Sequence, residues 1–214
     1  FSTSHPKDIH DQVLHVMKKY DNIAKHIHLP AQSGNSRILE KMNRTYTREW
    51  YINKYNRIKE LIPECSVSCD IITGFCTETE DEHQDTLSLL RECPFEFSYM
   101  YYYSERPGTL AARKFEDDVP EDIKKRRLAE VIKIQHEIAN KLNSTQVGKI
   151  HEVLIEMQSK KNENEWMGRN EQNIKVIFPK ENFNMGQFVK VMIDRSTTTS
   201  LIGRGISLVK KEFN

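Results

Sequence analysis

Apolar positions in the first two thirds of the chain follow two periods that alternate along the sequence. Residues 9–20 and 47–62 carry apolar side chains three and four positions apart, which predicts amphipathic helices, and Pro63 ends the second one. Residues 27–30, 67–74 and 97–103 are short runs rich in β-branched and aromatic residues, as is typical of strands. This alternation from residue 9 to about 143 predicts a parallel α/β arrangement.

The strand expected over residues 67–74 ends in a glycine turn that runs directly into an acidic helix start. Thr77 with Glu80 three positions later forms a capping-box pattern, so the helix is expected to begin at Thr77. An α/β protein binds ligands at such junctions, because the carboxyl ends of parallel strands share one edge. A plain strand-to-helix connection uses the same residue types, so both interpretations stand at this point.

The pattern changes after a long helix that is expected to begin near Pro120 and to continue to about residue 143. Residues 151–157, 174–178 and 187–193 alternate or run apolar at strand length, with Gly168, Gly186 and Gly203 at the expected breaks. A small β-barrel or sandwich is therefore predicted, and the chain divides into residues 1–143 and 144–214.

The charge of the whole chain indicates no particular binding partner, and any such indication comes from the charge of the C-terminal part. The 214 residues carry a net charge of +1, but residues 147–214 hold 11 Lys and Arg against 8 acidic residues, a mild excess that suits an RNA-binding barrel as well as a solvated surface. There is no apolar run of the roughly 20 residues that a membrane helix needs, so a soluble cytoplasmic protein is expected. The first residues resemble the end of a strand, and further upstream sequence is expected.

The four cysteines at positions 65, 69, 76 and 93 do not have the C-x3-C-x2-C spacing of a radical-type iron–sulfur site. Because Cys69 lies on an expected buried strand, packed free thiols are predicted in preference to a metal site. We therefore predict no metal ligand within this sequence.

Several ordered motifs give a more specific indication. They are His28-Leu29-Pro30-Ala31-Gln32-Ser33-Gly34, Met42-Asn43-Arg44-Thr45-Tyr46-Thr47, Asp70-Ile71-Ile72-Thr73-Gly74-Phe75 and Tyr103-Ser104-Glu105-Arg106-Pro107-Gly108-Thr109. Their order and spacing resemble the radical S-adenosylmethionine methylthiotransferases, with the closest likeness to the MiaB-type tRNA methylthiotransferases. Residues 168–173 and 186–189 resemble the TRAM domain of that family.

The resemblance implies the C-terminal part of a partial parallel, TIM-like radical SAM barrel followed by a small all-β TRAM barrel. It implies addition of a methylthio group to C2 of an isopentenylated adenosine beside the tRNA anticodon. S-adenosylmethionine and two iron–sulfur clusters would be the cofactors, with the cluster ligands in regions that precede the residues shown. The implied partners are the tRNA anticodon stem-loop and an electron donor, and a monomer without membrane association is expected.

Two alternatives remain open from the sequence. One is a freestanding RNA-binding module. The other is a sister methylthiotransferase acting on threonylcarbamoyladenosine or on a ribosomal-protein aspartate.

Cofactor-binding candidates lie where the expected strands end. Gln32 and Ser33 could hydrogen-bond the cofactor, Gly74 would let the backbone approach adenine, and the planar guanidinium of Arg106 could pair with a carboxylate or phosphate. Each of these also fits an ordinary turn or surface position. Glu78 is expected to complement the helix dipole rather than to act as a base, and no catalytic residue is assigned.

RNA-binding candidates combine cations with one aromatic ring that could stack on a splayed-out base. They are Arg44, Tyr46, Arg48, Arg169, Lys175, Lys190 and Arg204. Surface charge without a ligand is the alternative for each of the cations.

Overall fold

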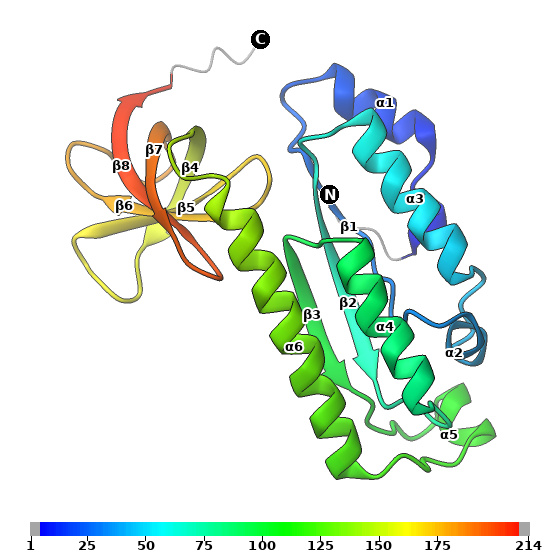
Figure 1. Ribbon diagram of the computed structural model, residues 1–214. Coiled ribbons are helices and arrows are strands. Elements are labelled where there is room, and N and C mark those ends of the chain that lie inside the picture. Colours follow the sequence, from blue (N-terminus) through cyan, green and yellow to red (C-terminus); the bar gives the residue numbers. More distant parts are fainter. Residues whose placement is uncertain (1–4, 210–214) are drawn as a thin grey trace.

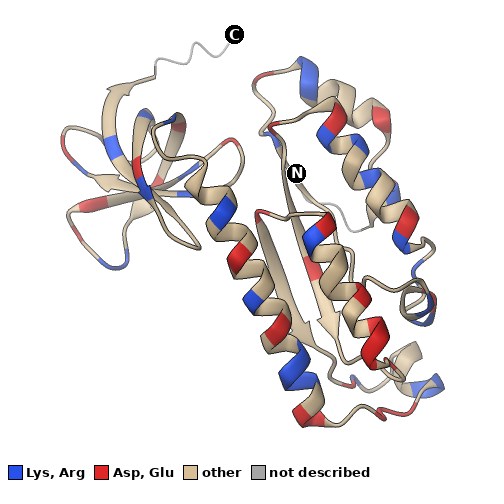
Figure 2. Cartoon of the chain, viewed as in Figure 1, with Lys and Arg blue, Asp and Glu red and all other residues tan. Residues whose placement is uncertain are grey.

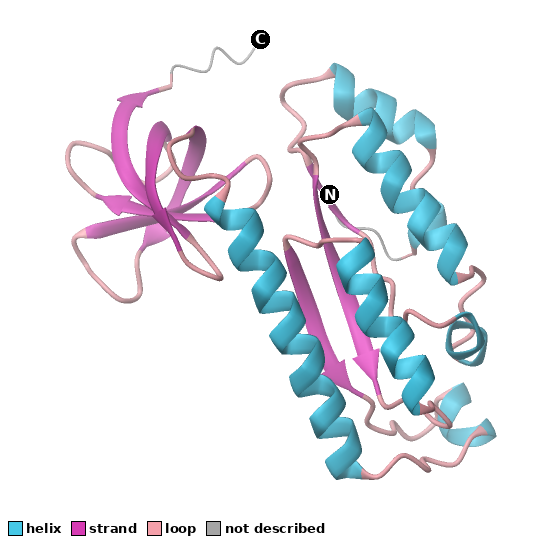
Figure 3. Cartoon of the chain, viewed as in Figure 1, coloured by secondary structure: helices cyan, strands magenta, loops and turns pink. Residues whose placement is uncertain are grey.

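The computed structural model describes residues 5–209, in which a parallel sheet covered by helices is followed by a separate barrel (Figures 1 and 3). The strands of the sheet are β1 (His26–His28), β2 (Ser66–Thr73) and β3 (Phe97–Tyr102). The helices are η1 (Pro6–Asp8), α1 (Asp11–Lys19), α2 (Ser36–Lys41), α3 (Arg48–Leu61), α4 (Glu80–Glu92), α5 (Leu110–Lys114) and α6 (Glu121–Ser144).

All pairings within the sheet are parallel, and the strand order is β1-β2-β3. Val67, Cys69 and Ile71 of β2 point into a core that they share with side chains of α3, α4 and α6. Because side chains alternate along a strand, Ser66, Ser68 and Asp70 point to the opposite face. The helices thus cover one face of the sheet, and all three strands end at the edge where α2 and α5 lie (Figure 1).

The N-cap of helix α4 lies two residues later than the capping pattern predicted. Its N-cap is Thr79, whose side chain accepts from the backbone N–H of Glu82, while the Glu82 carboxylate accepts from the N–H of Thr79. Thr77 instead has a φ of 66°, and its N–H donates to Asp118. The prediction was wrong because two overlapping pairs, Thr77 with Glu80 and Thr79 with Glu82, have the spacing of a capping box. The left-handed backbone at Thr77 excludes the first pair.

The second part is a closed barrel with the strand order β4-β5-β6-β8-β7. Its strands are β4 (Ile150–Gln158), β5 (Glu165–Asn170), β6 (Lys175–Pro179), β7 (Phe188–Ser196) and β8 (Leu201–Leu208). Gly168 and Gly203 were expected at breaks but lie inside β5 and β8, where an added Cβ would clash with the backbone oxygens of Leu154 and Met192. Glycine in these strands permits close approach of the neighbouring backbone.

Helix α6 runs from the edge where the strands end to the barrel (Figure 1). Near its C-terminal end, Asn143 Nδ2 donates to the carbonyls of Thr197 and Thr198, at 2.9 and 3.1 Å. A second contact joins the two parts at the other edge of the sheet, where Ser66 Oγ donates to the carbonyl of Gln172 at 2.6 Å. The barrel is therefore held against the amino ends of the parallel strands.

Within residues 5–209, no helix has both the length and the apolar character required to cross a membrane. The α/β arrangement and the following β-barrel agree with the fold predicted from the sequence.

Candidate functional site

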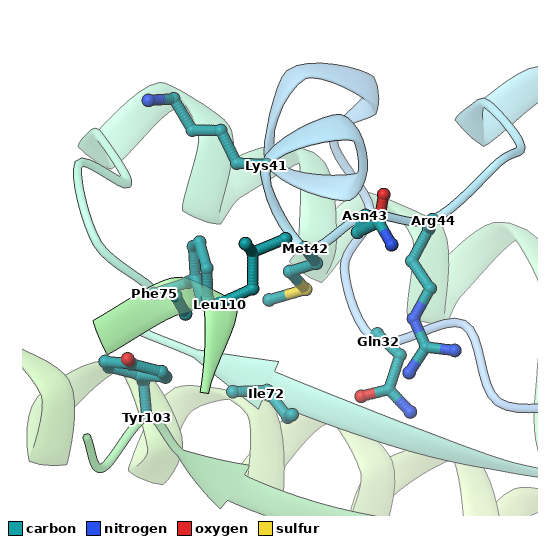
Figure 4. Close-up of a pocket in the computed structure, with 10 residues that line it drawn as sticks. Gln32, Lys41, Met42, Asn43, Arg44, Ile72, Phe75, Tyr103 and Leu110 are labelled. Atoms are coloured by element: carbon teal, nitrogen blue, oxygen red, sulfur yellow. The ribbon is translucent and has the colours of Figure 1, made fainter. Parts of the chain in front are cut away.

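A pocket of about 200 Å³ lies where the loops after the three parallel strands meet (Figure 4). We call it the rim pocket. Its wall comes from the loop after β1, the end of α2 with its following turn, the end of β2, the loop after β3, and α5. The lining residues are Gln32, Lys41, Met42, Asn43, Arg44, Ile72, Phe75, Tyr103, Leu110 and Ala111.

Gln32 occupies a strained position in this wall. It is 7% exposed and has a φ of 70°, which a residue with a side chain rarely adopts. Its backbone N–H donates to the carbonyl of Asp70 at 2.8 Å, and its carbonyl accepts from Ile72 at 2.9 Å, so it extends the sheet beyond β1. Non-glycine residues held at positive φ concentrate at functional sites, and Gln32 combines this geometry with an amide in a pocket wall.

Gly74 shapes the turn after β2 but faces away from the rim pocket. It has a φ of 65°, and a Cβ at this position would collide with the alkyl chain of Lys124 on α6. Its N–H donates to Glu78 Oε2 at 2.6 Å, and the same oxygen accepts from Arg127 at 2.9 Å. Glycine is therefore required by the turn and by the packing of α6, and the residue of this turn that reaches the pocket is Phe75.

Glu78 lies in the helix interface rather than at a solvated helix start. Its side chain is fully buried, and that of Arg127 is 5% exposed. Burial raises the pKa of the Glu78 carboxyl, while the Gly74 N–H and Arg127 oppose this effect. The pair fixes the turn that carries Phe75, which the dipole argument from the sequence did not anticipate.

The other two cofactor candidates lie outside the pocket wall. Ser33 is buried, and its hydroxyl accepts from the N–H of Asn35 at 3.2 Å and lies 3.5 Å from Thr86 Oγ1. Arg106 is exposed on the loop after β3, and its carbonyl accepts from Thr109. Of the four candidates, only Gln32 lines the rim pocket.

Sequence reasoning missed the apolar part of the pocket, above all Ile72, Phe75 and Tyr103. Phe75 and Tyr103 meet edge to face at 4.9 Å between ring centroids. Burial raises the pKa of Tyr103 to about 12, so its phenol stays protonated. All three residues lie in or beside the motifs at the ends of the expected strands. The sequence-based cofactor candidates were polar side chains and one glycine, so these apolar and aromatic positions were not among them.

The structure separates the three RNA candidates that follow α2. Arg44 is half-buried and lines the rim pocket. Tyr46 is 5% exposed and donates to the carbonyls of Pro30 and Ala31, so its ring is not free to stack on a base. Arg48 donates to the carbonyls of Gly34 and Asp85 and pairs with Glu92 at 3.0 Å. These contacts give Tyr46 and Arg48 a structural task.

The four cations proposed on the barrel differ in their surroundings. Arg169 pairs with Glu156 at 3.2 Å and donates to Asn173, and exposed Arg204 pairs with Asp194. Lys175 on β6 is half-buried, and Lys190 on β7 is exposed. Pairing with a carboxylate reduces the field that the two arginines can offer a phosphate.

The four cysteines belong to the hydrophobic clusters of the α/β part. All four are buried and free. Burial raises the thiol pKa of Cys65, Cys69 and Cys93 to about 12 and also raises that of Cys76. Metal ligation requires the thiolate, so these side chains are suited to packing.

One group of acidic and histidine side chains within the described residues has metal-like spacing. Glu80, His83 and Glu130 bring one ligand atom each within 4.8 Å of one another. Arg126 pairs with both carboxylates at 2.6 Å, and His83 Nε2 lies 2.8 Å from Glu130. Arg126 already occupies carboxylate oxygens that a cation would use, and these ion pairs join α4 to α6.

Two family models match separate parts of the chain. Residues 1–90 match the radical SAM superfamily, and residues 144–206 match the TRAM domain. The chain is 56% identical over 204 residues to the tRNA-2-methylthio-N(6)-dimethylallyladenosine synthase of Amoebophilus asiaticus, covering 95% of this chain and 42% of that protein. The protein of the same name from Phocaeicola vulgatus is 47% identical over 206 residues, covering 96% and 45%.

A solved structure, described as coproporphyrinogen III oxidase (HemN) from Escherichia coli, a radical SAM enzyme, shares the fold. The TM-score is 0.50 at 14% identity, over 97% of this chain and 51% of that one. The chain spans less than half the length of the curated relatives given above. The resemblance predicted from the sequence is confirmed.

Proposed function

We propose that this chain, which carries a TRAM domain and part of a radical SAM domain, is the cofactor- and substrate-holding part of a tRNA methylthiotransferase. The intact enzyme would add a methylthio group to C2 of N6-dimethylallyladenosine in tRNA. One observation carries the proposal: the chain aligns over 95% of its length with a synthase of that name at 56% identity. The segments that form the rim pocket lie within this alignment.

The rim pocket fits part of S-adenosylmethionine. Its volume of about 200 Å³ is below the roughly 300 Å³ of small drug-sized sites, so it suits one portion of the cofactor. Ile72, Phe75 and Tyr103 offer flat apolar surface to a purine ring, and the amides of Gln32 and Asn43 offer both donors and acceptors to its edge. When bound with a reduced iron–sulfur cluster, S-adenosylmethionine supplies the 5′-deoxyadenosyl radical for the reaction.

The iron–sulfur clusters would be held by other residues of the intact enzyme. The cysteines described above are buried, and their raised thiol pKa values keep them protonated near neutral pH. The two clusters and their electron donor therefore belong to the proposal without a ligand from this chain.

The barrel would bind the tRNA through its backbone phosphates. Arg169, Lys175, Lys190 and Arg204 remain the proposed contacts, with the two lysines as the main ones because carboxylates compete for the arginines. Arg44, at the rim pocket, would lie next to the RNA loop that delivers the target base. We propose a cytoplasmic monomer that binds the anticodon stem-loop; Gly74, Ser33 and Arg106 would support the rim from outside the pocket.

The activity is tested with the intact enzyme, reconstituted without oxygen and supplied with tRNA that carries N6-dimethylallyladenosine. Mass spectrometry of the digested tRNA should show the 2-methylthio derivative of that nucleoside. Product on threonylcarbamoyladenosine or on a ribosomal protein alone would refute the substrate assignment, and tRNA binding without any product would favour a plain RNA-binding module.

The cofactor assignment is tested separately with Gln32→Gly, which keeps the positive φ and removes the amide. Loss of one hydrogen bond should weaken S-adenosylmethionine binding by about two- to tenfold in equilibrium dialysis. Gln84→Ala, at an exposed position on α4, is the control and should bind normally. Equal affinities for the two variants would remove Gln32 from the site.

The RNA contacts are tested with a double variant, Arg169→Gln with Lys175→Gln. Affinity for tRNA should fall, and the slope of log affinity against log salt should become shallower by about one for each lost phosphate contact. Lys18→Gln on the exposed face of α1 is the control. An unchanged slope would show that this face of the barrel is only solvated.

A further inference from the structure

The face of the parallel sheet away from the helices has an unusual combination of side chains. Polar groups cover β1 and β2 there, and aromatic rings cover the adjoining β3. We call this surface the open face; it consists of His26, His28, Ser66, Ser68, Asp70, Phe97, Tyr99 and Tyr101. Asp70 is the one charged residue within the sequences of β2 and β3 (Figure 2).

The polar side chains form a continuous chain of contacts. Ser66 Oγ lies 2.7 Å from His26 Nδ1, and the other ring nitrogen of His26 lies 3.3 Å from Ser68 Oγ. Ser68 Oγ lies 2.9 Å from His28 Nδ1, and His28 Nε2 lies 3.4 Å from Asp70 Oδ1. This series of polar contacts begins at Ser66, which also contacts the barrel. It holds the ring of His28 and the carboxylate of Asp70 in one orientation.

The aromatic row beside this chain is exposed to an extent that a folded domain rarely leaves without a function. Phe97 and Tyr99 are each 49% exposed, and Tyr101 is 55% exposed. Tyr99 meets His28 edge to face at 5.9 Å and Phe97 at 4.7 Å, so its ring is held in place on two sides. Contiguous exposed apolar surface with a polar border is characteristic of binding sites.

The open face continues directly into the rim pocket. Ile72 lines the pocket and pairs in register with Tyr101, while Asp70 pairs with Tyr99 one step back along the same face. Residues two apart on a strand are separated by about 7 Å. A planar ligand that lies on the open face beside the pocket would therefore contact Tyr99, Tyr101 and Asp70 together.

We propose that the open face receives the target base, with Tyr99 and Tyr101 contacting its apolar N6 substituent and the Asp70 carboxylate accepting a hydrogen bond from the N6–H. The inference rests on the proposed function and adds the residues that would distinguish an alkenylated adenosine from an unmodified one. The N6 nitrogen of dimethylallyladenosine carries one N–H donor beside a five-carbon apolar group. A carboxylate next to two tyrosine rings offers one acceptor and one apolar surface in that arrangement.

The test uses the intact enzyme and two anticodon stem-loop RNAs that differ only in the dimethylallyl group. Fluorescence anisotropy gives the ratio of the two affinities, and burial of the alkenyl group should make the modified RNA bind about tenfold more tightly or better. Tyr99→Ala should reduce this ratio by at least about threefold, whereas Tyr99→Phe should retain it because the ring remains. Tyr20→Ala removes a tyrosine that is 47% exposed at the end of α1 and should leave the ratio unchanged.

The outcomes separate this inference from the proposed function. If Tyr99→Ala weakens both RNAs equally, or only lowers the melting temperature, the face is covered by protein and the inference is wrong. A wild-type enzyme that binds both RNAs equally also overturns it, even if the methylthio product forms. If the intact enzyme binds neither RNA and forms no product, the proposed function itself fails.

Discussion

Replacement of Arg127 by methionine should destabilise the α/β part far more than the same change at the neighbouring Arg126. The Arg127 guanidinium donates to Glu78 Oε2 at 2.9 Å and to the carbonyl of Glu78 at 3.0 Å, and both side chains are almost completely buried. Removing one partner of a buried ion pair costs about 3–5 kcal/mol, because the other charge stays buried without compensation. Arg126 is 43% exposed, and an exposed pair contributes about 0–1 kcal/mol.

Urea unfolding at neutral pH, followed by circular dichroism at the helical band, measures this difference, since every helix of residues 5–209 ends before the barrel begins. Arg127→Met should also lower the melting temperature by roughly 6–20 °C for a chain of this size. The double variant Arg127→Met with Glu78→Gln should recover much of the loss, because no charge then remains buried. Equal costs for Arg127→Met and Arg126→Met would refute the argument from burial.

Two further predictions concern the sheet and the barrel. Burial lowers the pKa of His26 to about 4 from an ordinary value near 6.5. As the pH falls, the unfolded chain therefore binds the proton before the folded chain does. The free energy of unfolding should fall by up to about 3 kcal/mol between pH 6.5 and pH 4. Urea unfolding across that range should show a shallower pH dependence for His26→Gln, while His15→Gln, at an exposed position, should keep the wild-type slope. Gly203→Ala should destabilise the barrel because the added Cβ would strike a backbone oxygen of β7. Overpacking of this kind costs about 1–3 kcal/mol or more. The control is Gly186→Ala, where φ is +86° but the added Cβ meets open space, and Gly203→Ala should have the lower melting temperature of the two.

The sequence predicted the sheet well, because its buried strands and amphipathic helices have strong local patterns. It placed the strand around Asp70 and the end of α3 at Pro63 correctly, and the structure has β2 from Ser66 to Thr73 and α3 ending at Leu61. It missed β5 and β8, since Gly168 and Gly203 interrupt the pattern and only the curvature of a closed barrel explains glycine there.

The candidate site was predicted less well, for a physical reason. Polar residues at strand ends are candidate ligand contacts in a sequence. The direction and the burial of each side chain decide which of them face a ligand. Ser33 and Tyr46 turned out to satisfy backbone and side-chain partners inside the protein, whereas Phe75 and Tyr103 form the pocket wall. These orientations depend on contacts between residues far apart in the sequence, such as Gly74 with Lys124, which no local pattern reports.

Helix α6 sets the distance between the rim pocket and the barrel. Its 24 residues correspond to about 36 Å, with Lys124 packed on Gly74 near one end and Asn143 bound to the β7–β8 turn near the other. One inserted residue would turn the barrel by about 100° and displace it by about 1.5 Å, whereas seven would shift it by about 10 Å with nearly the original orientation. The length of this helix therefore sets how far from the rim, and in which direction, a bound RNA can be presented.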